Sequence, residues 1–99
     1  MHKWMFDNPK NTAVIADAYF IERKEPCVYV THDADDGGWQ FLTENTRGDP
    51  SRALVVALST AIAVDVSLND LHDLPLGWAA SRSTRESPWQ RKPIVSRVE

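Results

Sequence analysis

Short runs of apolar residues, several of them alternating with polar ones, mark the first half of the chain as strand-forming. Residues 12–16 (TAVIA) are apolar and β-branched, while residues 27–32 (CVYVTH) and 38–43 (GWQFLT) alternate with the period of two that a strand requires. Between the last two runs lies DADDG (33–37), whose residues tolerate positive φ and hydrogen-bond their own backbone. The pattern predicts one strand, a brief helical turn capped by Asp17, and then a β-hairpin.

The second half of the chain predicts further strands around one helical region. Residues 53–57 (ALVVA) are fully apolar, which predicts a central strand. Ser59 and Asp65 can each cap a helical segment ahead of leucines spaced three residues apart, so one broken helix and two short helices fit equally well. Residues 77–82 (GWAASR) and 88–93 (PWQRKP) predict two closing strands.

These elements predict an α+β domain: a mostly antiparallel sheet of about five to six strands with one principal, possibly interrupted helix packed on it. The chain of 99 residues, 42% of them apolar, is long enough for one compact core and too short for two. We assign residues 12–92 to this single domain, residues 1–11 to a polar N-terminal leader and residues 93–99 to a C-terminal tail.

Composition narrows the class of protein. Cys27 is the only cysteine, which excludes an intramolecular disulfide and a multi-cysteine zinc site. The net charge of −3 argues against nucleic acid as a partner, because nucleic-acid affinity comes from neutralising phosphates. No apolar run is long enough to span a membrane, and the N-terminus lacks the apolar core of a signal peptide. We therefore expect a cytoplasmic protein that binds neither nucleic acid nor membrane.

The acidic turn partly matches a calcium loop. Counted from Asp33, it has acids at positions 1, 3 and 12 and Gly38 at position 6, as an EF-hand does. Position 5 is Gly37, which has no ligand atom, and a strand through 38–43 would carry Glu44 roughly 20 Å from the turn at about 3.3 Å per residue. A hairpin turn is favoured, and we predict no metal site, no cofactor and no catalytic residue.

Tryptophan is favoured both in cores and at the centres of interfaces. Trp39 alternates with its neighbours in a predicted strand and is better explained as a core residue, whereas Trp78 follows a loop, where an exposed indole is more plausible. An aromatic patch beside an acidic turn would suit a protein-binding face. The candidate partner-binding residues are His32, Asp33, Asp35, Asp36, Trp39, Trp78 and Arg82.

The order of the motifs resembles a family of small bacterial domains of unknown function, relatives of which are immunity proteins of polymorphic-toxin systems. The resemblance spans about residues 11–92 and rests on VYVTHDADDGGWQFL, on DVSLNDLHDLPLGWAASR and on a tryptophan near the end of the chain. Val66 departs from the proline expected after Asp65, which removes a preset φ at a helix start. The matching positions are Asp33, Asp35, Asp36 and Trp39 in the turn, Asp65, Ser67 and Leu68 at the helix start, and Asp73, Leu74, Pro75, Gly77 and Arg82 beyond it.

The resemblance implies a bacterial protein without enzymatic activity, and a toxin-like protein as its partner. Our first hypothesis is accordingly a protein-binding module whose acidic hairpin meets a basic surface by charge complementarity. Two alternatives stay open: a domain that binds a divalent metal or small ligand through residues 32–36, and an accessory structural domain. A homodimer is also compatible with the sequence, since an edge strand or an exposed tryptophan can support one.

Overall fold

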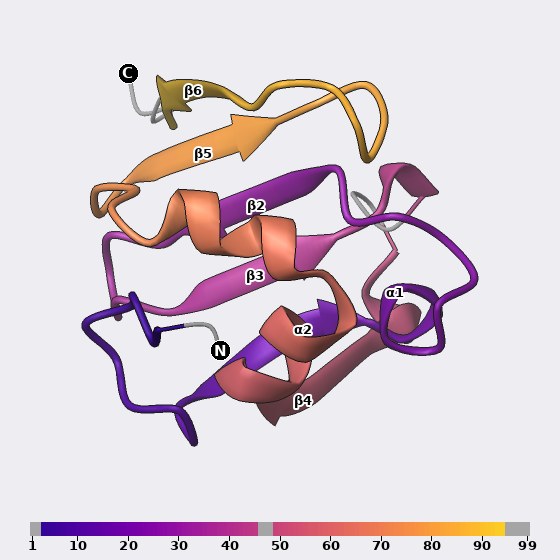
Figure 1. Cartoon of the computed structure of the whole chain (residues 1–99), viewed down its shortest axis with the longest axis horizontal. Coiled ribbons are helices and arrows are strands. Elements are labelled where there is room, and N and C mark those ends of the chain that lie inside the picture. Colours follow the sequence, from indigo (N-terminus) through magenta and orange to yellow (C-terminus); the bar gives the residue numbers. More distant parts are fainter. Residues whose placement is uncertain (1–2, 46–48, 95–99) are drawn as a thin grey trace.

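One mixed sheet organises the part of the chain that the computed structural model describes, residues 3–45 and 49–94 (Figure 1). Its strands are β1 (Ala13–Asp17), β2 (Tyr29–His32), β3 (Trp39–Leu42), β4 (Ala53–Ala57), β5 (Trp78–Ser81) and β6 (Gln90–Pro93). The strand order is β4-β1-β3-β2-β5-β6, and all neighbours are antiparallel except β1 and β3, which run parallel. The predicted α+β class and mostly antiparallel sheet are confirmed.

The helical segments are short and include α1 (Ala18–Ile21), α2 (Leu58–Val64) and the 3₁₀ helices η2 (Pro50–Arg52) and η3 (Val66–Leu71). The region between β4 and β5 thus forms two short helices, α2 and η3, which settles the alternative that the sequence left open. Across the described residues, no helix has the length and apolar character needed to cross a bilayer.

Aspartate side chains cap two of these helices where the sequence predicted it. Asp17 accepts a hydrogen bond from the Tyr19 N–H (2.6 Å) at the start of α1, and Asp65 accepts one from the Ser67 N–H (3.0 Å) at the start of η3. Each bond satisfies a backbone N–H that has no partner within its helix. Both helix starts are therefore set by local chemistry.

The predicted cap at Ser59 is wrong. The helix α2 begins at Leu58, and no side chain caps it. The Leu58 N–H donates instead to the Thr12 carbonyl (2.8 Å), and the Ser59 N–H donates to the Lys10 carbonyl (3.0 Å). Backbone carbonyls of the neighbouring segment satisfy these first N–H groups, so α2 needs no side-chain cap.

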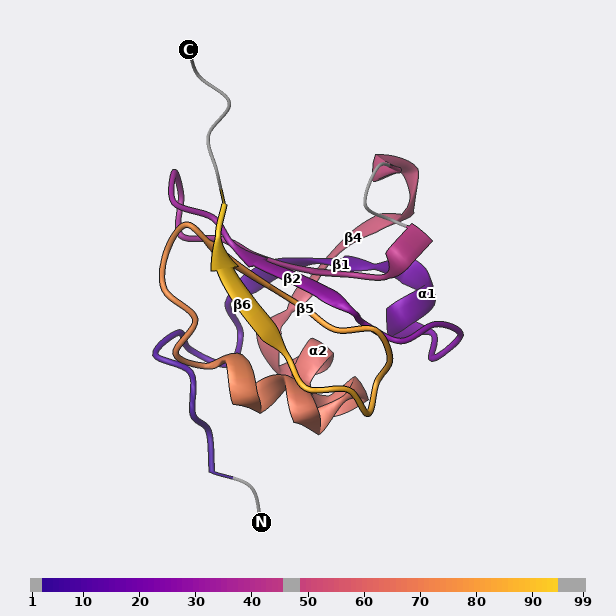
Figure 2. The ribbon, with the colours of Figure 1, turned by 90° about the horizontal axis from the view of Figure 1, so that it is seen from above.

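The helices α2 and η3 cover one face of the sheet (Figure 2). A 3₁₀ helix has three residues per turn, so Leu68 and Leu71 lie on one side of η3 and both are fully buried. The next leucine in the stripe, Leu74, is 2% exposed. The buried residues that the sheet contributes beneath them include Val14, Ala16, Val30, Trp39, Phe41 and Ala80.

Strand β4 lies at an edge of the sheet, not at its centre as its apolar sequence predicted. Its Leu54 and Val55 side chains are 40% and 70% exposed. Strand β1 is the next strand inward, and it pairs with β4 on one side and β3 on the other. Both strands are apolar, and only the assembled sheet decides which of them receives a neighbour on each side.

The N-terminal segment packs on the domain, although the sequence predicted a polar leader outside it. Phe6 is 5% exposed and meets the Trp39 ring edge-on, with ring centroids 5.2 Å apart. Asn8 accepts hydrogen bonds from both neighbouring indoles, from Trp4 at its carbonyl (2.8 Å) and from Trp39 at its side chain (3.1 Å). This part of the leader therefore closes one end of the core.

Candidate functional site

The acidic stretch between β2 and β3 is the turn of a β-hairpin, as predicted. The Asp33 N–H donates to the Gly38 carbonyl (2.8 Å), and the Gly37 N–H donates back to the Asp33 carbonyl (2.9 Å). Gly37 has φ +72°, a left-handed conformation that suits glycine. The Asp36 side chain accepts from the Gly38 N–H (2.8 Å), so part of the acidic character serves the turn itself.

Two exposed apolar side chains stand at the same end of the sheet as this turn. Backbone hydrogen bonds run from Gly77 N–H to the His32 carbonyl (2.6 Å) and from Ile94 N–H to the Gly77 carbonyl (2.8 Å), which draws three segments together. Leu76 is 57% exposed and Ile94 is 45% exposed. A Cβ placed on Gly37 would lie 3.9 Å from Leu76 Cδ2, so the leucine borders the turn.

We call this the hairpin-tip surface and define it by Asp33, Asp35, Asp36, Leu76 and Ile94. The carboxylates stand on a turn held by its own hydrogen bonds, and the Gln40 side chain also donates to Asp33 (2.8 Å). Sequence reasoning identified the aspartates but missed both apolar residues. Leu76 had a local signal, because a leucine between Pro75 and Gly77 sits in a turn where burial is difficult, whereas Ile94 fell in the predicted tail.

The predicted site residue His32 is tied into the fold. Its ring stacks on Trp39 with centroids 3.9 Å apart, and its Nδ1 lies 2.7 Å from the Leu74 carbonyl, an acceptor to which it must donate. Trp39 itself is 2% exposed and belongs to the core, as its alternation indicated. Trp78 is half-buried and packs against the core. His32 and Trp39 therefore pack on each other within the hairpin, and Trp39 is not accessible to a partner.

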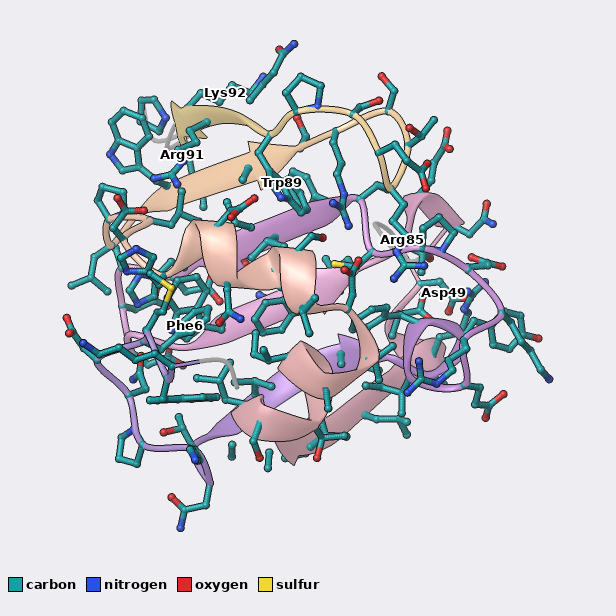
Figure 3. All side chains as sticks on the ribbon, viewed as in Figure 1. Phe6, Asp49, Arg85, Trp89, Arg91 and Lys92 are labelled. Carbon is teal, nitrogen blue, oxygen red and sulfur yellow. The ribbon has the colours of Figure 1, made fainter. Side chains whose placement is uncertain are left out.

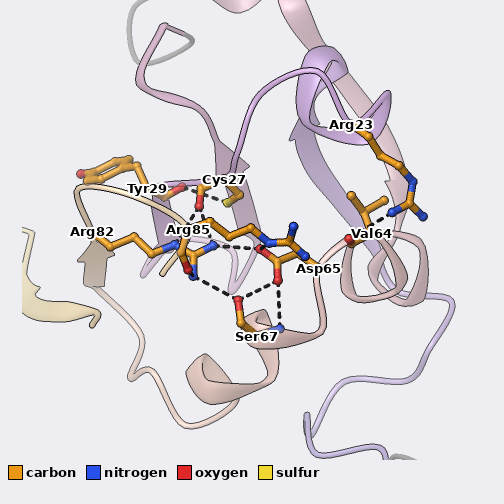
Figure 4. A network of polar contacts seen from close by, with 8 residues as sticks. All are labelled: Arg23, Cys27, Tyr29, Val64, Asp65, Ser67, Arg82 and Arg85. Carbon is orange, nitrogen blue, oxygen red and sulfur yellow. Dashed lines mark hydrogen bonds and ion pairs between the residues drawn. The ribbon is translucent and has the colours of Figure 1, made fainter. Parts of the chain in front are cut away.

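Arg82, also predicted to bind a partner, is buried with its hydrogen-bond donors engaged (Figure 4). Its Nε and Nη2 donate to the Cys27 carbonyl (3.0 and 2.8 Å), and its Nη1 donates to Ser67 Oγ (3.0 Å) and the Arg85 carbonyl (2.9 Å). The guanidinium also lies over the Trp89 ring, 4.1 Å from its centroid. Arg82 is therefore a structural residue, and its assignment to a binding surface is corrected.

Asp65 completes this network. Its Oδ2 lies 2.9 Å from Arg82 Nη2, and its Oδ1 accepts from both the N–H and the hydroxyl of Ser67. Burial by itself raises the pKa of the Asp65 carboxyl, but the bonds from Ser67 and Arg82 outweigh burial and hold the pKa below its usual range. The carboxylate is thus ionised at neutral pH and works as a helix cap and as the partner of Arg82.

Cys27 is fully buried beside this network. Burial raises the pKa of its thiol to about 12. The nearby positive charge of Arg82 lowers this pKa, but by less than burial raises it. Since the thiolate is the nucleophilic form, this cysteine does not supply covalent catalysis at neutral pH.

An open cleft of about 450 Å³ lies beside Asp65, between the segment after α1 and residues 84–86. Arg23, Lys24 and Arg85 line it together with Glu25, Glu86 and Asp65. The lining of the cleft therefore carries side chains of both charges.

Another buried network, which sequence reasoning did not anticipate, joins Asp17 to β4. Asp17 is fully buried and accepts from Thr43 Oγ1 (2.8 Å), and Arg52 Nη2 lies 3.1 Å from its Oδ2 and 2.9 Å from Glu25 Oε1. Arg52 also stacks on the Tyr19 ring at 3.9 Å. The network anchors the start of β4, and its residues come from four separate segments of the sequence.

No group of three or more His, Cys, Asp or Glu side chains is placed to hold a metal ion in residues 3–45 and 49–94. At the hairpin turn, Asp33 and Asp36 already use carboxylate oxygens as acceptors for Gln40 and Gly38. The part of the chain that the structure describes therefore offers no preformed ligand set for the metal-binding alternative.

Comparison of the chain with protein-family models, with curated proteins and with solved structures finds no match. The resemblance to immunity-related domains therefore stays a prediction. A functional assignment therefore rests on the geometry of the described residues: a hydrogen-bonded acidic turn with exposed apolar side chains at the same end of the sheet.

Proposed function

We propose that this protein is a non-enzymatic protein-binding module that engages its partner through the hairpin-tip surface. The observation that carries the proposal is the placement of Leu76, 57% exposed, against the turn that presents Asp33, Asp35 and Asp36. Interfaces combine apolar anchors with a charged rim, and a handful of anchors supply most of the binding energy. Leu76 and Ile94 fit the first role and the aspartates the second.

The chemistry of this surface selects a protein partner that carries an apolar pocket ringed by lysine or arginine. Opposite charges on the two faces would steer association and raise its rate, most strongly at low salt. Backbone hydrogen bonds hold the turn and the adjoining loop, so little ordering would be needed on binding. The resemblance noted in the sequence implies a bacterial toxin as this partner.

The test compares three tagged full-length proteins in capture from lysate of the native organism: wild type, the Asp33/Asp35/Asp36→Asn variant, and a control in which exposed Glu44, Asp70 and Glu86 become amides. The two variants change net charge equally and nearly preserve side-chain shape. We expect one partner to be retained by wild type and control and lost by the hairpin variant. Equal capture by all three proteins contradicts the proposal.

A second comparison addresses the apolar part of the surface. Leu76→Ser is expected to weaken binding of the captured partner by about tenfold or more, as loss of an interface anchor does, mainly through faster dissociation. Val66→Ser is the matched control, because Val66 is 49% exposed on η3 and lies outside the hairpin-tip surface. Equal loss with both variants would argue against a specific role for Leu76.

A further inference from the structure

Strand β4 is an edge strand without the usual protection against pairing. Its sequence, ALVVA, contains neither charge nor proline, and Val55 is 70% exposed. The opposite edge, β6, carries Arg91, Lys92 and Pro93, which are residues that block edge-to-edge pairing (Figure 3). Among residues 3–45 and 49–94, one edge of the sheet is therefore closed to a further strand, and the other is open.

The hydrogen bonds of β4 with β1 show which backbone groups are unused. The bond from Leu58 N–H to the Thr12 carbonyl (2.8 Å) marks a hydrogen-bonded position of the antiparallel ladder. Such positions recur every second residue, so Leu54 and Val56 direct their N–H and C=O groups toward β1. The alternate residues of the strand, Ala53, Val55 and Ala57, direct theirs away from the sheet.

We propose that β4 pairs antiparallel with β4 of a second copy of this chain, about a two-fold axis at Val55. This register sets Val55 opposite its own counterpart and Ala53 opposite Ala57 of the partner copy, so every outward N–H and C=O group meets a matching one. A two-fold interface must be self-complementary, and this edge has the required symmetry. The two sheets would join into one continuous sheet.

The surroundings of β4 favour a second copy as the occupant. From Ala53 to Val64, through β4 and α2, the chain has no charged residue, so the two-fold axis brings no like charges together. In each copy α2 lies on one face of the sheet (Figure 2), and a two-fold axis perpendicular to the sheet would place both α2 helices on the same face. The residues that α2 exposes, Thr60 and Ala63, are small and permit close approach.

The proposal is independent of the proposed function, because the hairpin tip lies at the end of the strands and β4 lies along a side of the sheet (Figure 1). A strand pair of this length buries less than the about 1,200 Å² of a standard stable interface. Association is therefore expected to depend on concentration, and each dimer would present two hairpin tips.

Sedimentation velocity of the full chain from about 10 µM to about 1 mM tests the association. We expect wild type to shift from monomer to dimer over this range. Val55→Lys is expected to remain monomeric, because it sets like charges opposite one another across the axis. The matched control Gln90→Lys adds the same charge to the exposed edge strand β6 and should dimerise as wild type does.

Amide hydrogen exchange of wild type locates the contact without any substitution. Protection of the Val55 N–H is expected to rise with protein concentration, while the Val56 N–H, bonded within the sheet, is protected throughout. A wild type that stays monomeric at about 1 mM overturns the proposal. So does a dimer in which Val55 exchange is independent of concentration, because another surface must then hold the two copies together.

Discussion

Asp65 and Arg82 form a buried ion pair, with 2.9 Å between Oδ2 and Nη2 and side chains only 5% and 1% exposed. Asp65 caps η3, and Arg82 follows β5 and donates to the Cys27 carbonyl ahead of β2. The pair therefore joins the helical layer to the strands it covers. Removal of either partner would leave the other charge buried and uncompensated.

Asp65→Ala is expected to lower the free energy of unfolding by about 3 to 5 kcal/mol, the range for breaking a buried pair from one side. The measurement is urea denaturation at neutral pH. Asp73→Ala is the control: Asp73 pairs with Arg91 at 2.9 Å on the surface, and its loss should leave the midpoint almost unchanged. Similar midpoints for the two variants would show that the buried pair is not a stabilising contact.

Stability should fall at acid pH, in part through Asp65. Its pKa is lowered on folding, so its contribution is fully present above the unfolded pKa of about 3.9 and is lost as the pH falls through the folded value. Urea midpoints measured from about pH 6 to about pH 2 should decline below about pH 4. Asp65→Asn should flatten part of this decline, and an identical pH profile in the variant would assign the acid sensitivity to other carboxyls.

Cys27 should be unreactive in the native protein. It is fully buried, and burial raises the pKa of its thiol to about 12. At pH 8 a reagent therefore cannot reach the sulfur, and the thiol is not ionised to the reactive thiolate. A chromogenic disulfide reagent should react with the thiol only after addition of denaturant, with Cys27→Ala as the blank. Rapid, stoichiometric labelling of the folded protein would contradict the burial of this residue.

Gly37→Ala is expected to destabilise the protein by about 1 to 2 kcal/mol, the cost of placing an ordinary residue in a left-handed conformation. The cost comes from the backbone conformation of Gly37, which has φ +72°. It does not come from a steric clash, because the nearest atom to an added Cβ would be Leu76 Cδ2 at 3.9 Å, an ordinary van der Waals distance. Gly37→Asn is the matched comparison and should cost less, because asparagine tolerates positive φ. Thermal melts of the two variants measure the difference, and a larger loss with asparagine would point to crowding.

Several elements could be predicted from the sequence because their determinants are local. The alternation in residues 38–43 correctly placed Trp39 and Phe41 on one face of β3, and the structure shows that this face is the buried one. Asp17 and Asp65 were recognised as helix caps, since a cap needs only the N–H groups two residues ahead. The hairpin followed from turn residues between two alternating runs.

The errors came from contacts between distant segments. The apolar sequence of β4 predicted a central strand, but β4 lies at the edge of the sheet. Strand order depends on pairing between distant segments, which apolar character alone does not specify. Ser59 has the chemistry of a cap, but α2 begins one residue earlier, at Leu58, because backbone carbonyls of Thr12 and Lys10 accept the N–H groups of Leu58 and Ser59. Arg82 was predicted to lie on the surface, but its guanidinium is buried and donates to the carbonyl of Cys27, which lies 55 positions earlier in the chain.

The sequence by itself determined the strands, the turn and two helix caps of this protein, because these depend on backbone preferences and hydrogen bonds within a few residues. Only the tertiary structure decided that Leu76 borders the acidic turn, that Ile94 lies at the same end of the sheet, that Arg82 is buried, and that β4 is an edge strand. Those properties arise from the packing of segments far apart along the chain. A local sequence pattern does not specify which distant segments will come into contact. Both the proposed binding surface and the proposed dimer contact belong to this second class.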